Sequence, residues 1–150
     1  MYFKILYLGF KIYCFLFRPV RMGVRVVIIQ NDEVLLIRHT YLSGWYLPGG
    51  GLKRGEALDQ AARREAYEET GADLREVKLL GVFTNFTQWK TDHTAIFLCA
   101  NFKITGKSDG EIAEVLAFPL KKLPPDMYSV HRDLLEKYKA GAILTPFGEW

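Results

Sequence analysis

Hydrophobic and polar positions alternate in short runs along this chain, which predicts a domain that mixes strands and helices. Residues 23–29 form a mainly apolar run that predicts a buried strand. Asn31 and Asp32 mark a turn, and residues 33–38 form the returning strand. Further apolar runs predict strands over residues 77–83, 94–102 and 114–120.

Two segments have the composition of helices. Residues 57–70 are good helix formers without a breaker, and Gly71 is a natural stop. The small apolar stripe of this helix, spaced four residues apart, predicts close packing and consists of Leu58, Ala62 and Ala66. The second predicted helix spans residues 127–139, and its apolar side carries Leu134, Leu135 and Tyr138.

The order of these elements predicts the fold class. Strands and helices are mixed without strict βαβ alternation, so we expect an α+β sandwich with helices packed against a mixed sheet. The 150 residues, 49% hydrophobic and 25% charged, suit a single globular domain. We place this domain at residues 21–150, preceded by a separate segment at residues 1–20.

Residues 1–18 are unusually hydrophobic and carry basic residues at intervals of seven, namely Lys4, Lys11 and Arg18. This spacing aligns the charges along one stripe of a helix, although Gly9 and the aromatic content also permit a strand. Lys11 splits the apolar run too early for a transmembrane span. No small-residue cleavage site follows, so a signal peptide also fits badly.

Two interpretations of residues 1–18 remain open. The segment lies in a membrane interface with its basic stripe toward anionic headgroups, or it packs on the domain or on a second copy in a homodimer. Residues 1–25 carry five basic and no acidic side chains, so the net charge of +3 leaves −2 for the remainder. Cys14 and Cys99 have neither metal-ligand nor redox spacing, which indicates a reducing cytoplasm.

The candidate chemistry lies in residues 48–72, PGGGLKRGEALDQAARREAYEETGA. The glycines after Pro48 allow close approach of the backbone to a ligand. Glu65, Glu68 and Glu69 follow at i, i+3 and i+4, so they crowd one helix face and repel one another. Mg2+ prefers such oxygen ligands and would offset the repulsion. The alternative is an ordinary solvated acidic face.

The spacing of glycines and charges from Gly50 to Ala72 resembles the Nudix box, the signature of the Nudix hydrolases. Every charged position and both glycines of that pattern are present; Ala66 and Ala72 stand where the family more often has a larger aliphatic residue. The resemblance implies a mixed sheet between helices, with the box forming a loop, a helix and a second loop.

The resemblance also implies an activity: hydrolysis of a diphosphate linkage in a nucleoside diphosphate linked to another group, by a water activated by Mg2+ or, as a substitute, Mn2+. The implied metal ligands are the Gly49 carbonyl and the carboxylates of Glu65, Glu68 and Glu69. Arg64 would orient a box carboxylate, and Glu56 would tie the loop to the helix.

A further catalytic carboxylate is expected outside the box. Glu111 occupies the position of a family glutamate that precedes an aromatic residue by six positions, but Ala117 replaces that aromatic. Glu111 is therefore the first candidate and Glu114 the second, with a solvated loop glutamate as the alternative.

Substrate contacts are predicted on both sides of the box. His39, Tyr41 and Trp45 flank the glycine loop. The polar-aromatic segment after the box contributes Asn85, Asp92 and His93, whereas Phe86 and Trp89 fit stacking on a substrate and plain packing equally well.

Three functions are compatible with these residues. The first is a pyrophosphohydrolase of nucleoside triphosphates or nucleotide-sugar-like compounds, the second an RNA 5′-pyrophosphohydrolase, and the third a non-catalytic nucleotide-binding domain. Nucleic acid is disfavoured as a partner, because the basic residues at the N-terminus are mixed with large hydrophobic ones. The third ranks last, because the box is complete.

Overall fold

The structure, a computed structural model, describes residues 2–142 and 145–150. A six-stranded mixed sheet in the order β7-β2-β1-β5-β4-β8 forms its centre, and β3 and β6 form a separate antiparallel pair. The elements are α1 (Tyr2–Phe17), β1 (Val20–Gln30), β2 (Glu33–His39), α2 (Leu58–Thr70), β3 (Ala72–Leu74), β4 (Lys78–Asn85), β5 (Thr91–Cys99), β6 (Phe102–Ile104), β7 (Ile112–Pro119), α3 (Ser129–Lys139) and β8 (Phe147–Glu149).

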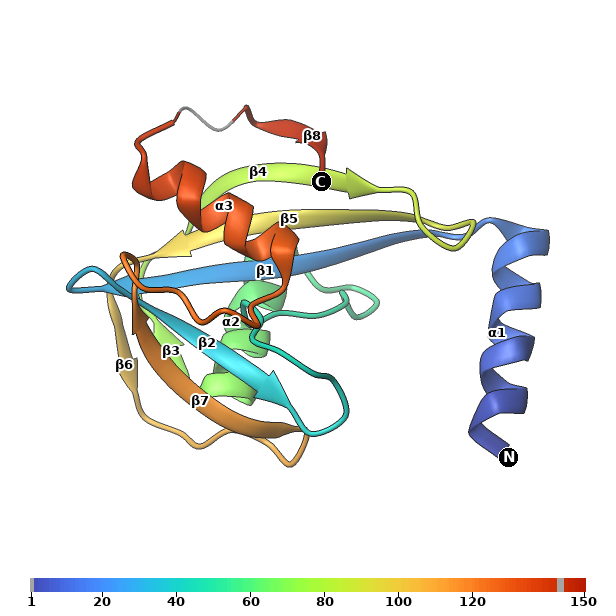
Figure 1. The fold of residues 1–150 in the computed structure, drawn as a ribbon, viewed down its shortest axis with the longest axis horizontal. Coiled ribbons are helices and arrows are strands. Elements are labelled where there is room, and N and C mark those ends of the chain that lie inside the picture. The colour runs from blue at the N-terminus through green and yellow to red at the C-terminus, as the bar shows by residue number, and fades with distance from the viewer. Residues whose placement is uncertain (1, 143–144) are drawn as a thin grey trace.

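Helices α2 and α3 cover opposite faces of this sheet (Figure 1). Alternate residues of β1 face the two sides: Val27 packs in the cluster that contains Leu134 and Leu135 of α3, and Val26 packs in the cluster that contains Ala62 of α2. This two-sided core confirms the predicted α+β sandwich and follows from the strand period of two.

The box helix has the predicted packing and end. Ala62 and Ala66 are fully buried, so their small side chains let α2 lie close to the sheet. Gly71 caps α2 in the left-handed conformation at φ 72°. A Cβ there would lie 2.3 Å from the carbonyl oxygen of Gly106, so both the backbone angle and the available space require glycine.

Several element boundaries differ from the predictions. The predicted strand over 94–102 is wrong at its end: β5 stops at Cys99, and Phe102 begins β6, which pairs with β3. The chain turns at Asn101, whose carbonyl accepts a hydrogen bond from the Cys99 thiol. The second helix begins at Ser129, and the short strands β3, β6 and β8 were not predicted because three residues carry too little periodicity.

The hydrophobic segment at the start of the chain is a helix, α1, which projects beyond the end of β1 and β5, away from α2 and α3 (Figure 1). In the part of the chain that the structure describes, no helix is both long and apolar enough to cross a bilayer.

Candidate active site

The glycine loop lies beside β1 and is held there by backbone hydrogen bonds. The N–H of Val26 donates to the Pro48 carbonyl and the N–H of Val24 to the Gly50 carbonyl, both at 2.9 Å. Gly49 has φ 142°, and a Cβ there would lie 2.1 Å from the Val24 carbonyl oxygen. This close approach of two backbones explains why the loop needs glycine.

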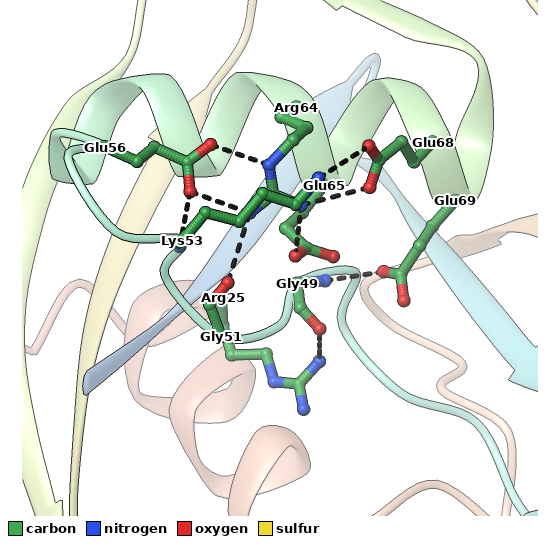
Figure 2. Close-up of polar contacts among 9 residues, drawn as sticks. All are labelled: Arg25, Gly49, Gly51, Lys53, Glu56, Arg64, Glu65, Glu68 and Glu69. Carbon is green, nitrogen blue, oxygen red and sulfur yellow. Dashed lines mark hydrogen bonds and ion pairs between the residues drawn. The ribbon is translucent and has the colours of Figure 1, made fainter. Parts of the chain in front are cut away.

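Arg64 is the centre of an ion-pair network that joins α2 to the loop before it (Figure 2). Its Nε and Nη2 donate to the two carboxylate oxygens of Glu56 at 2.6 and 2.8 Å. These hydrogen bonds hold the pKa of Glu56 at about 2, well below its ordinary value. The Arg64 Nη1 also donates to Glu65 at 2.6 Å and to Glu68 at 3.0 Å.

Glu69 is the buried carboxylate of the box, with 8% of its surface exposed. Its Oε2 accepts a 2.6 Å hydrogen bond from the Gly49 N–H (Figure 2). Burial raises the pKa of Glu69 to about 7, although the Gly49 hydrogen bond and the nearby Arg25 charge act in the opposite direction. A carboxylate desolvated in this way gains from an added cation.

Arg25 supplies a partly buried positive charge beneath the glycine loop. Its Nη1 donates to the carbonyls of Gly49 and Leu47, so the guanidinium fixes the loop from the strand side (Figure 2). Burial lowers the pKa of Arg25, and the charges of Glu69 and Glu65 raise it. Sequence reasoning missed this residue; the signal was a single charge inside the apolar run of β1.

A second acidic group approaches Glu69 from the loop between β6 and β7. The Glu111 N–H donates to the Asp109 side chain at 3.1 Å, and the Asp109 charge contributes to the raised pKa of Glu69. Burial raises the pKa of Tyr41, and the charge of Glu111 raises it further. Asp109 was missed, although its Asp-Gly-Glu sequence context was a visible signal.

His39 lies in this same region, next to the Tyr41 ring at 5.2 Å between centroids. Burial lowers the pKa of His39, the Arg25 charge lowers it further, and Glu111 and Asp109 raise it. The alternative carboxylate, Glu114, instead forms an ion pair with Arg38 at 3.4 Å. Glu111 therefore shares the region of His39 and Tyr41, whereas Glu114 is paired with Arg38.

The three box carboxylates of α2 form hydrogen bonds with different groups. Among the described residues, no three His, Cys, Asp or Glu side chains are arranged to hold one metal ion, because Glu65 and Glu68 turn toward Arg64 while Glu69 turns toward Gly49. Their chemistry nevertheless fits a hard divalent cation: all the donors are oxygens, and they lie on one helix face beside a glycine loop.

Two cavities are lined by Arg25, and the first of them also adjoins the glycine loop. One, of about 270 Å³, is lined by Gly50, Arg25 and the predicted substrate residues Asp92 and His93, among others. The other, of about 180 Å³, includes Arg25, Asp92 and the predicted Asn85. Its walls also contain three residues that sequence reasoning did not select, Tyr128, His131 and Trp150, because they are distant in sequence from the box.

Three aromatic residues lie away from these cavities. Trp45, predicted to contact substrate, is buried in the core against Phe118 and below the Arg38 guanidinium, so its indole fills the interior. Phe86 is exposed, and Trp89 packs edge-on against Phe15 of α1. The structure therefore does not support Trp45 as a substrate contact, and it places Trp89 beside α1.

The comparison with protein families identifies the chain. The family model described as the NUDIX domain matches residues 19–138. The chain therefore belongs to the NUDIX family, as the box predicted.

Curated relatives match over part of their length. The chain is 46% identical over 57 residues to diphosphoinositol polyphosphate phosphohydrolase 2 of Rattus norvegicus, covering 37% of this chain and 32% of that protein. It is 37% identical over 71 residues to an RNA pyrophosphohydrolase of Psychromonas ingrahamii, covering 47% of this chain and 39% of that protein. The matched region thus covers about a third to two fifths of the length of these relatives.

Solved structures match more completely. A MutT NUDIX hydrolase from Burkholderia pseudomallei has a TM-score of 0.68 at 25% identity and covers 78% of this chain and 96% of its own. A UDP-X diphosphatase structure gives the same TM-score and identity over 85% of this chain and 66% of its own. These matches confirm the predicted Nudix fold.

Proposed function

We propose that this protein is a pyrophosphohydrolase that depends on a divalent metal and cleaves a diphosphate linkage in a nucleoside diphosphate linked to another group. One observation carries the proposal: buried Glu69 is anchored on the Gly49 N–H, beside Glu65 and Glu68 on the same helix. Family membership supports a hydrolase acting on phosphorus anhydrides.

The metal would be held by Glu65, Glu68 and Glu69 with the Gly49 carbonyl, and Mg2+ or Mn2+ fits these oxygen donors. Such an ion activates water and neutralises phosphate charge when bound. Arg64 holds Glu65 and Glu68 in position through its hydrogen bonds. Both carboxylate oxygens of Glu56 accept hydrogen bonds from the Arg64 guanidinium, and this paired contact limits the motion of Arg64.

Other side chains would act on the substrate and the attacking water. Glu111, in the loop that also brings Asp109 near Glu69, would accept a proton from the water. Arg25 would attract the negatively charged phosphates through its charge. The cavities lined by Asn85, Asp92 and His93 would receive the remainder of the nucleotide. His39 and Tyr41, which lie near Glu111, would supply further contacts.

A second candidate substrate is RNA with a 5′-triphosphate. It is favoured by the similarity to an RNA pyrophosphohydrolase. The linkage cleaved would be the same, so the box residues would have the same roles and only the substrate contacts would differ. A non-catalytic binding domain ranks last, because every box carboxylate is present.

Product release from a substrate panel tests the proposal. The panel contains nucleoside triphosphates, nucleotide sugars, ADP-ribose, dinucleoside polyphosphates, a diphosphoinositol polyphosphate and 5′-triphosphate RNA, each with and without Mg2+. Metal-dependent cleavage of a nucleotide supports the proposal, and cleavage of RNA alone selects the second candidate. Absence of cleavage across the panel by folded protein with metal present counts against both.

A further inference from the structure

Among the residues whose side chains the structure describes, helix α1 exposes large apolar side chains on several of its sides. Leu16 and Phe17 are 65% and 69% exposed. The other exposed residues of this kind on α1 are Tyr7, Leu8, Phe10, Ile12, Tyr13 and Phe15. An exposed apolar surface of this extent normally marks a contact with protein or lipid, so this surface requires a partner.

The contacts of α1 with the body lie at the loop that joins β4 to β5. Phe15 packs edge-on against Trp89, with 5.5 Å between ring centroids, and Gln88 donates a weak 3.4 Å hydrogen bond to the Tyr7 hydroxyl. Trp89 and the neighbouring Phe86 are themselves exposed. The apolar surface of α1 therefore continues onto the body.

The charged side chains of the segment that contains α1 have one sign. Residues 1–25 carry five basic and no acidic side chains. Lys11 lies within α1 and Arg18 directly follows its last residue, Phe17. The Lys11 ammonium lies 4.8 Å from the centroid of the Tyr7 ring. Basic side chains can reach the headgroup level of a membrane from an apolar helix, and tyrosine and tryptophan prefer the same level.

The length of α1 decides how it would meet a bilayer. Its 16 residues extend about 24 Å at 1.5 Å per residue, which is shorter than a hydrocarbon core of about 30 Å. A helix of this kind lies in the plane of the interface, with its apolar residues among the acyl chains.

We propose that α1, together with Phe86 and Trp89, docks this protein on the surface of an anionic membrane. The apolar residues enter the interface, and Lys11 and Arg18 bind the phosphate groups of anionic lipids. The cavity lined by Arg21 to Arg25 follows α1 directly along β1. Docking therefore places the candidate active site next to the lipid surface.

A second copy of the chain fits this surface less well than a membrane. A helix in a dimer buries one stripe, whereas the exposed large apolar residues of α1 lie on several sides of the helix. A symmetric dimer through α1 would also bring the basic residues of two copies together without an acidic partner from residues 1–25. A bilayer covers the apolar sides and neutralises the basic residues at the same time.

Co-sedimentation of the full chain with vesicles tests the proposal. We compare vesicles of phosphatidylcholine with vesicles that contain 40% phosphatidylglycerol, a composition chosen for the assay. The wild type should bind the anionic vesicles at least tenfold more tightly than the neutral ones, and the difference should shrink as salt increases. Equal binding to both, or binding to neither, would overturn the proposal.

Paired substitutions locate the docking surface. Leu8→Gln with Leu16→Gln should weaken binding at least tenfold, whereas Leu79→Gln with Leu116→Gln, which alters exposed leucines on β4 and β7, should leave it unchanged. Lys11→Gln with Arg18→Gln should weaken binding about 25-fold, at about fivefold for each charge. Circular dichroism confirms that each variant is folded.

The oligomeric state in free solution separates the membrane from a second copy. A monomer that binds anionic vesicles supports the proposal. A stable dimer that the Leu8→Gln and Leu16→Gln pair dissociates, and that does not bind vesicles, would overturn it and assign α1 to a subunit interface.

Discussion

Gly49 and Glu69 are joined directly: the backbone N–H of the glycine donates to the glutamate Oε2 at 2.6 Å. This bond links the glycine loop to the C-terminal part of α2 and holds a buried carboxylate among the box residues. The loop and the helix therefore form one unit, and a change on either side should affect both folding and turnover.

Gly49→Ala tests the loop. The added Cβ would overlap the Val24 carbonyl oxygen and would adopt an unfavourable backbone angle, so we expect a loss of about 3 kcal/mol of stability. For a chain of this length, Tm should fall by about 6–12 °C. Gly51→Ala is the matched control, because a Cβ there meets no atom within 4 Å. Equal losses in the two variants, measured by urea unfolding, would contradict the account.

Arg64→Lys tests the ion-pair network. Lysine keeps the charge but cannot form the two-pronged contact with Glu56 while also reaching Glu65 and Glu68. We expect kcat/KM to fall about 10–100-fold, as for other groups that orient metal ligands. Arg75→Lys, at an exposed arginine paired with Asp73, should have no effect. An unchanged kcat/KM in Arg64→Lys would show that the network is dispensable.

His131 should make the stability of the fold depend on pH. Its Nδ1 accepts a hydrogen bond from the Leu47 N–H at 3.1 Å, and burial holds its pKa well below 6.5. In the unfolded chain His131 therefore becomes protonated near pH 6.5, whereas in the folded chain it stays neutral at that pH. Stability should fall as pH decreases below 6.5, at up to about 1.4 kcal/mol per pH unit from this group.

The variant His131→Asn keeps an acceptor for the Leu47 N–H and removes the titrating ring. Urea unfolding of both proteins between pH 7.5 and 5.5 isolates the contribution of the histidine. The difference in unfolding free energy between wild type and variant should narrow toward acid pH, and a constant difference would contradict the assignment.

The sequence predicted the parts of the molecule that rest on local patterns. Local patterns identified the box helix, its end at Gly71 and the apolar run that forms most of β1. They did not identify Arg25, whose role depends on the loop that crosses β1, or the meeting of Tyr128, His131 and Trp150 beside Asn85. Such contacts depend on tertiary packing, which local periodicity does not encode.

Trp45 is a residue for which the local sequence predicted a role that the tertiary structure does not support. Its place beside the glycine loop in sequence suggested a substrate contact, but its ring is buried in the core against Phe118. An aromatic residue next to a catalytic motif can either pack in the core or bind a ligand. Which of the two it does depends on tertiary contacts, such as that of Trp45 with the Arg38 guanidinium, which the local sequence does not predict.

The most direct test of the central claim is the Mg2+ dependence of hydrolysis in the wild type and in Glu68→Gln, on the best substrate of the panel. Glu76→Gln, at an exposed glutamate outside the box, is the control. We predict that the wild type and the control need Mg2+ and that Glu68→Gln is slower by about 100-fold or more while remaining folded. Turnover without metal, or a wild-type rate in Glu68→Gln, would contradict the assignment of the box carboxylates as metal ligands.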